Sequence, residues 1–352
     1  MPTAFRLMLL DRLAALEPLV GQLQSAAQER EQALAGIAVT GHTQLQDAVA
    51  MDAGRIFATW AGALGRDRWR IFKSRERLKE VNLGGTAIGT GAGAPRQYVL
   101  GVIRQLQALT PHPVSRADDP VEATANWDSV AEAMSAANVL AQTLRRIGTD
   151  IRLLASGPVS GFGLLSLPPL LKGSSIMPGK VNPVLAEAAI QVAERVMAND
   201  ALIGRLCAAG ELQLNAFFPL ISFTAHESLV LLAGILPGLA AYVGQLDLDR
   251  QRAASQAAAG RGGSLGLLPL LGYDATEALV NQAQSAGESL RAVVEAAGVF
   301  EPDDLDSLFS PRILGGMGYD EARYALLQER YGSALAAWRL ALTAGSAPKE
   351  TP

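Results

Sequence analysis

The chain has 352 residues, 49% of them hydrophobic and 18% charged, with a net charge of −4. This composition excludes a disordered chain and gives no electrostatic reason to bind nucleic acid or acidic lipid. A single cysteine, Cys207, excludes an internal disulfide framework, and no metal site is expected because the three histidines are far apart in the sequence: His42, His112 and His226.

Long helices are the main prediction along the first two thirds of the chain. The N-terminal segment carries Arg6, Asp11 and Arg12 within its apolar stripe, so it does not resemble a signal peptide. Apolar residues recur at helical spacing over residues 4–35, 45–80, 127–155, 183–208 and 217–246. Such segments are longer than the mean globular helix of about 11–12 residues. They predict an all-α fold, with a bundle of long helices over residues 1–247.

Residues 228–246 raise the question of a membrane span, because these 19 positions contain no charged residue. Pro237 stands in the middle of the segment, and His226 and Glu227 precede it. Flanking Lys or Arg residues of the kind that orient membrane helices are absent. The segment therefore favours a core helix of a soluble bundle over a membrane-associated chain.

The pattern changes after residue 247. Helical segments become shorter and are separated by turn and cap signals such as GYD and EPDDLDSLF. We therefore expect a small C-terminal helical domain over residues 248–352.

Three polar stretches interrupt the apolar helices: TGHTQLQD at 40–47, NLGGTAIGTG at 82–91 and GSSIMPGKVNP at 173–183. Each has a structural explanation by itself, as a helix start, a sharp turn and a solvated linker. Their occurrence together in one chain indicates a functional site.

The third stretch does not match a phosphate-binding loop. Gly173 and Gly179 are separated by five residues instead of four, and Val181 stands where such a loop needs a hydroxyl. No G-x-S-x-G elbow is present either, so a Ser-His-Asp hydrolase is not indicated.

A serine in this loop can still act as a base if a helix N-terminus and backbone amides stabilise its alkoxide. A helix begins at Pro183, which directs its amide donors toward Lys180 and Asn182. A lysine and an asparagine beside a helix N-terminus are well suited to bind a carboxylate. The reaction class that this favours is removal of a proton next to a carboxylate, followed by loss of a leaving group from the adjacent carbon.

GSSIMPGKVNP resembles the signature loop of the fumarase/aspartase superfamily, and its KVNP ending is similar to the fumarase and aspartase branch. TQLQDAV, NLGGTAIGTG, GELQLNAFFPLI and the C-terminal GYDAT and GESLRAVVEAAGVF also resemble that branch, in the same order. The resemblance covers nearly the whole chain.

The resemblance implies a role for each matching residue. Ser174 is the expected general base, while Lys180 and Asn182 bind the substrate carboxylate and stabilise its aci-carboxylate intermediate. Thr43 and Gln44 are expected to contact substrate from another subunit. The supporting residues of the site are Glu187, Gly173, Ser175, Met177 and Gly179. The resemblance further implies a small dicarboxylate substrate, no cofactor, and a cytoplasmic homotetramer with active sites shared between subunits.

Two positions bear on the substrate. Fumarases typically have histidine at the position of Gln44, paired with the glutamate that is here Glu187, whereas several aspartases have TQLQD. Deamination of aspartate to fumarate is therefore the leading prediction, and malate dehydration is the alternative. His42 departs from the arginine that usually precedes Thr43, which leaves the exact substrate open.

The N-terminal end of the chain differs from that of other family members. Members are usually longer, with an N-terminal domain that ends in S-[ST]-N-D-x-x-P-T-A, and residues 1–4 resemble only the end of that segment. We therefore expect the 352-residue chain by itself to be weakly active or inactive. A truncated, non-catalytic protein that still oligomerises is the alternative from a different functional class.

Overall fold

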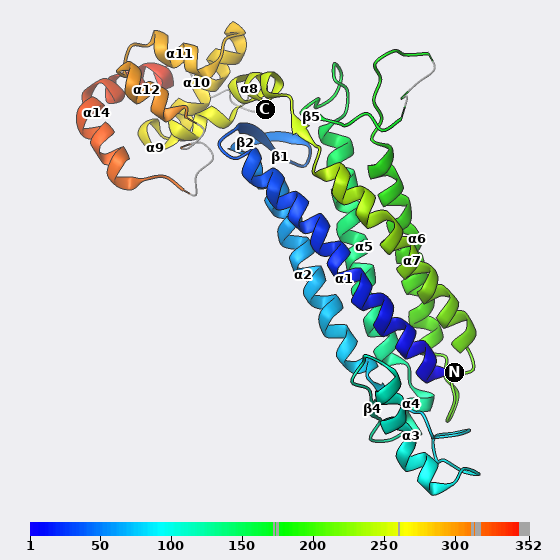
Figure 1. Cartoon of the computed structure of the whole chain (residues 1–352). Coiled ribbons are helices and arrows are strands. Elements are labelled where there is room, and N and C mark those ends of the chain that lie inside the picture. Colours follow the sequence, from blue (N-terminus) through cyan, green and yellow to red (C-terminus); the bar gives the residue numbers. More distant parts are fainter. Residues whose placement is uncertain (172, 174–175, 260, 311–312, 314–317, 345–352) are drawn as a thin grey trace, which may run out of the picture. The chain divides into compact units, whose positions relative to one another are not determined.

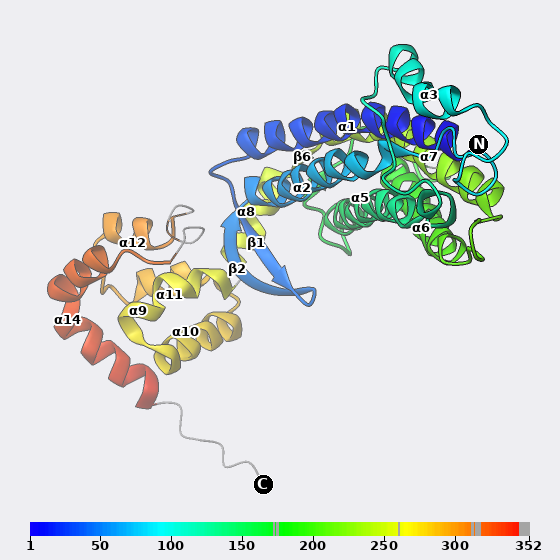
Figure 2. The same cartoon turned by 90° about the horizontal axis from the view of Figure 1, so that it is seen from below.

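The computed structural model describes residues 1–171, 173, 176–259, 261–310, 313 and 318–344 (Figures 1 and 2). The chain divides into two compact units. The first contains Met1–Arg30, Ala58–Phe162 and Leu167–Leu246; the second contains Glu31–Phe57, Gly163–Ser166 and the residues from Asp247 onward.

The first unit is built from five long helices, apart from the end of α1 and the first turn of α2: α1 (Pro2–Ala33), α2 (Gly54–Leu78), α5 (Asp128–Leu154), α6 (Val184–Cys207) and α7 (Phe218–Val243). Shorter elements follow α2: β3 (Glu80–Val81), α3 (Arg96–Leu109), β4 (Ser115–Arg116), which pairs in parallel with β3, and α4 (Glu122–Ala125). The predicted all-α bundle of long helices is confirmed for this part of the chain.

Small side chains let α5 and α6 pack closely. Ala133, Ala137 and Ala141 of α5 are buried, as are Ala186 and Ala189 of α6. The two helices approach closely at Gly148, since a Cβ there would lie 2.8 Å from the carbonyl oxygen of Ala186. This contact fixes the first turn of α6 against α5.

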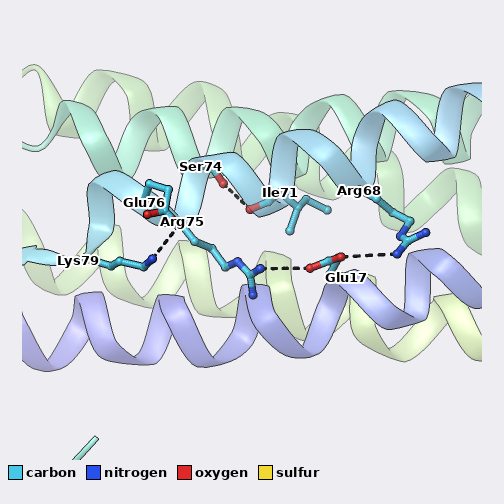
Figure 3. Close-up of polar contacts among 7 residues, drawn as sticks. All are labelled: Glu17, Arg68, Ile71, Ser74, Arg75, Glu76 and Lys79. Carbon is cyan, nitrogen blue, oxygen red and sulfur yellow. Dashed lines mark hydrogen bonds and ion pairs between the residues drawn. The ribbon is translucent and has the colours of Figure 1, made fainter. Parts of the chain in front are cut away.

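Polar contacts join α1 to α2 along one side of the bundle (Figure 3). The Glu17 carboxylate accepts a hydrogen bond from Arg75 Nη2 at 3.1 Å and lies 3.6 Å from Arg68 Nη2. One carboxylate on α1 thus bridges two arginines that lie two turns apart on α2.

Helix α7 is the one helix in the described ranges that is long and apolar enough to cross a membrane. Within this chain, 39% of its most apolar window is buried. Leu220, Phe223 and Val230 are exposed and fall on one face of the helix, together with Gly234 and Gly238. The chain therefore leaves several apolar side chains of α7 exposed, although Glu227 on the same face pairs with Arg195 of α6.

The second unit consists of short elements and one long helix of 24 residues, α14. Two antiparallel strand pairs, β1 (Ala38–Thr43) with β2 (Gln46–Asp52) and β5 (Leu165–Ser166) with β6 (Asp247–Leu248), precede its helices. The helices are α8 (Arg250–Ala259), the 3₁₀ helix η1 (Arg261–Gly266), α9 (Leu268–Leu271), α10 (Tyr273–Ala286), α11 (Leu290–Ala296), α12 (Pro302–Leu308) and α14 (Glu321–Ala344). Helix α8 packs on β1, and η1 packs on β2. The C-terminal helices α9, α10, α11, α12 and α14 enclose a core of mainly leucine, valine and tyrosine side chains.

The prediction of a helix from residue 45 is wrong over residues 45–53, which form a turn and strand β2 ahead of α2. Thr43 pairs with Gln46, so Gln44 and Leu45 form a two-residue hairpin turn. Helix α2 begins only at Gly54, whose N–H donates to Asp52 Oδ1 at 2.8 Å. The turn lacks the Asn-Gly or Asp-Gly pair that normally reveals such a hairpin in a sequence.

Replacing Gly148 tests the close approach of α5 and α6. The Gly148→Ala Cβ would press on the Ala186 carbonyl and on Ile190 Cγ1, 2.9 Å away. We expect the free energy of unfolding, measured with urea, to fall by about 1–3 kcal/mol. Gly204 lies in α6 with no atom within 4 Å of its Cβ position. Gly204→Ala should therefore raise the free energy of unfolding by roughly 0.5–1 kcal/mol. Equal effects of the two substitutions would contradict the close packing.

Candidate active site

The ends of the GSSIMPGKVNP loop meet in the first unit. Asn182 Nδ2 donates a hydrogen bond to the carbonyl oxygen of Gly173 at 2.7 Å. A Cβ at position 173 would lie 1.8 Å from the carbonyl oxygen of Lys180, so only glycine allows this approach. Between these ends the chain turns at Gly179, whose φ is +80°. The loop therefore holds Lys180 and Asn182 beside Gly173.

Helix α6 starts directly after this loop. The N–H of Val184 donates to the carbonyl of Asn182 at 2.9 Å, and the N–H of Glu187 donates to the carbonyl of Pro183 at 3.0 Å. The helix dipole and the remaining amides of the first turn favour an anion at this end. The side chains of Lys180 and Asn182 supply a cation and an amide at the same corner.

An open hollow of about 490 Å³ adjoins the loop. The described residues that line it are mostly apolar and include the Lys180 cation: Pro169, Leu170, Leu171, Gly173, Met177, Pro178, Gly179, Lys180 and Val181. Ser174 and Ser175, the predicted base and its neighbour, lie outside the described residues. Met177, a predicted supporting residue, is half-exposed on the wall of the hollow.

Glu187 lies in the first turn of α6, among groups from two other helices. Its carboxylate Oε1 is 3.7 Å from Arg152 Nε, in the last turn of α5. Tyr242, near the end of α7, is 1% exposed, and burial, followed by the negative charge of Glu187, raises the pKa of its hydroxyl to about 12. Arg152 thus balances the charge of Glu187, while Tyr242 stays protonated at neutral pH. Neither partner stood out in the sequence, because no motif links them to Glu187.

Thr43 and Gln44 belong to the second unit, at the tip of the β1–β2 hairpin, and both are exposed. Gln44 and Leu45 have φ values of 53° and 62°, the left-handed region that costs a non-glycine residue about 1–2 kcal/mol. His42 Nε2 lies 3.3 Å from Asp47 Oδ1, next to the turn. Strained backbone of this kind concentrates at functional sites.

The NLGGTAIGTG stretch lies in the first unit, where Asn82 connects three segments. Asn82 Nδ2 donates to Thr124 Oγ1 at 2.9 Å, and Thr3 Oγ1 donates to Asn82 Oδ1 at 3.2 Å. Thr86, with a φ of 55°, donates to the carbonyl of Ala92 at 3.0 Å. The stretch therefore joins the first turn of α1 to α4 through side-chain hydrogen bonds, and no motif indicated Thr124.

No group of three or more His, Cys, Asp or Glu side chains that could hold a metal ion occurs among the residues that the structure describes.

Comparison with known proteins gives consistent matches. A family profile described as lyase matches residues 1–198. Aspartate ammonia-lyase of Bacillus subtilis (strain 168) is 33% identical over 88% of this chain and 66% of its own length. The Escherichia coli (strain K12) aspartate ammonia-lyase is 33% identical over 92% and 68%, respectively. The chain therefore spans about two thirds of the length of these relatives.

Solved structures agree with this result. A fumarate lyase:delta crystallin from Brucella melitensis, in a structure bound to cobalt, has a TM-score of 0.86 and 33% identity, over 90% of this chain and 69% of that one. The class II fumarase from Schistosoma mansoni has a TM-score of 0.79 and 25% identity, over 89% and 69%.

Gly173→Ala tests whether the close approach of Gly173 to Lys180 orders the loop. The added Cβ must push the two segments apart and break the bond from Asn182, so amide hydrogen exchange of residues 176–183 should become faster. Gly179→Ala is the matched control, because position 179 has a positive φ but no atom within 4 Å of its Cβ position. Equal acceleration in both variants would show that backbone strain alone, and not the close approach, controls the loop.

Proposed function

Because the chain belongs to the fumarase/aspartase superfamily of lyases, and to its aspartase-like branch, we propose that it catalyses β-elimination on a succinyl-type dicarboxylate. The most specific form of the proposal is the conversion of L-aspartate to fumarate and ammonia. The observation that carries it is the corner at the start of α6, where Lys180 and Asn182 lie beside the amides of a helix N-terminus.

In the proposed reaction, Lys180 and Asn182 bind the carboxylate next to the carbon that loses its proton. Ser174, as an alkoxide, removes the Cβ proton, and the electron pair moves into that carboxylate to give the aci-carboxylate. The extra negative charge develops beside the Lys180 ammonium and the positive end of α6, which stabilise it. The electrons then return to form the C=C bond, the C–N bond breaks, and the substrate ammonium leaves as neutral ammonia.

The nature of residue 44 supports aspartate over malate. A hydroxide is a poor leaving group and needs a proton donor, whereas an ammonium group already carries the proton with which it departs as ammonia. Gln44 has no titratable group and cannot supply a proton. A hydratase acting on malate and fumarate is the second candidate, favoured by the likeness to the Schistosoma mansoni fumarase structure.

We further propose that the protein works as a cytoplasmic homotetramer, with Thr43 and Gln44 of one subunit contacting substrate held by Lys180 and Asn182 of another. The exposed Leu220, Phe223 and Val230 of α7 support an assembly, because exposed apolar side chains that share one helix face commonly mark an interface between proteins. Close approach of a neighbouring helix is favoured by Gly234, whose Cβ position has no atom within 4 Å.

The proposal is tested by fumarate formation from L-aspartate and from L-malate, with purified chain 1–352. We expect only weak fumarate formation from aspartate by the 352-residue chain, with a rate at least 10²-fold lower still in Ser174→Ala, in line with the loss of a general base. Calorimetric binding of succinate provides a readout that does not depend on turnover, and Lys180→Met should weaken it at least tenfold. Gln142→Ala, on the exposed surface of α5, is the control.

Faster turnover of malate than of aspartate would reject the proposal of aspartate deamination in favour of the hydratase. A chain that neither binds succinate nor forms fumarate would instead support the non-catalytic oligomerising protein.

A further inference from the structure

We propose that a groove between α2 and α5 is a binding site for inorganic phosphate. Three arginines hold the anion: Arg66, Arg70 and Arg146. The Asp67 carboxylate accepts a hydrogen bond from the proton that phosphate keeps at neutral pH. The groove shares no residue with the GSSIMPGKVNP loop or the β1–β2 hairpin, so this inference goes beyond the proposed lyase activity.

The groove lies entirely within the first unit, and all the residues that line it belong to the described ranges. Its polar lining comes from both helices: Arg66, Asp67 and Arg70 belong to α2, whereas Thr143 and Arg146 belong to α5. The volume of about 260 Å³ is equivalent to roughly nine water molecules. This space is sufficient for a small tetrahedral ion.

Positive charge is in excess along the groove, because three guanidinium groups and one carboxylate line it. Arg66 and Arg146 are both exposed. Arg146 Nε lies 3.8 Å from Asp150 Oδ2, a distance too long for a hydrogen bond. Guanidinium groups present paired N–H donors that match the oxygens of phosphate. The charged lining therefore favours an oxyanion.

Asp67 is the buried acidic member of the groove, with 1% exposure. Its Oδ1 accepts a hydrogen bond from Arg70 Nη1 at 2.7 Å. Its Oδ2 is buried and has no hydrogen-bond partner among the described residues. The Thr143 hydroxyl lies near this carboxylate but donates to the carbonyl of Val139 at 3.3 Å. A ligand that donates to Oδ2 would supply a partner that buried acceptors nearly always have.

The ionised Asp67 selects between oxyanions. Burial raises the pKa of Asp67, whereas Thr143, Arg70 and Arg66 act in the opposite direction. The hydrogen bond from Arg70 stabilises the charged form of the carboxyl group. A carboxylate repels sulfate, which has no proton to donate at neutral pH. Phosphate carries at least one O–H group at the same pH, and this group can donate to Oδ2.

A bound phosphate would connect the two helices. Oδ2 is closed to solvent, so the ion reaches it only when the arginine side chains beside it move. Arg70 is partly exposed and Arg146 is mostly exposed, and both side chains are long enough to turn onto the ion. Because Arg146 belongs to α5 and Asp67 to α2, the bound ion joins α5 to α2.

Calorimetric titration of purified chain 1–352 with inorganic phosphate and with sulfate tests the site, at neutral pH and matched ionic strength. We expect phosphate to bind about tenfold more tightly than sulfate, and Arg146→Gln to weaken phosphate binding about tenfold. Arg145→Gln is the matched control. Arg145 is the neighbouring residue on α5, but it pairs with Glu194 at 2.5 Å and lies outside the groove. Its replacement should leave the phosphate affinity unchanged.

Asp67→Asn tests the selecting role of the carboxylate. The substitution removes the charge that repels sulfate and adds an amide N–H, so the preference for phosphate over sulfate should fall by about tenfold. Circular dichroism and the melting temperature show whether the variant is folded. Arg146 is exposed, so Arg146→Gln keeps the proposal testable even if Asp67→Asn does not fold.

Equal affinities of the parental chain for phosphate and sulfate, or parental phosphate affinity in Arg146→Gln, would overturn the proposal. Phosphate binding should persist in Lys180→Met. Its loss in that variant would assign the ion to the start of α6 and would also overturn the proposal. Phosphate binding without fumarate formation would keep the groove and reject the lyase, whereas fumarate formation without phosphate binding would reject the groove alone.

Discussion

The contact between Gly148 and the first turn of α6 is the constraint on which the candidate site depends. It fixes the N-terminus of α6 against α5, and that terminus in turn follows directly on Asn182 and Lys180. The same packing brings Glu187 next to Arg152, in the last turn of α5. A small residue in the middle of an apolar interface therefore determines where a cation, an amide and a carboxylate are presented.

A second constraint operates within the loop itself. Gly173 touches the backbone of Lys180, and Asn182 closes the contact with a hydrogen bond to the Gly173 carbonyl. The described ends of the loop are therefore held against each other. The chemistry proposed for Ser174 requires such an arrangement, because a serine base must be presented repeatedly to the same substrate carbon.

The long helices could be predicted from the sequence because their periodicity is local and extends over many turns, as in α5 and α6. The β1–β2 hairpin could not, since its turn is made by Gln44 and Leu45 and not by the residues that the turn type prefers. The loop residues Lys180 and Asn182 were identified by their motif. Arg152, Tyr242 and Thr124 had no such signal, because their partners come from distant segments and only packing brings them together.

The composition of the second unit has a consequence for how the protein is made. Strands β1 and β2 are synthesised early, but α8 and η1, which pack on them, come from the far side of four long helices in the sequence. During translation the hairpin therefore lacks its packing partners until α8 and η1 have been synthesised. Contacts between segments so far apart in the sequence also form slowly. The elements of the first unit can meet sooner, so the order of synthesis favours a bundle that is assembled before the segment bearing Thr43 is secured.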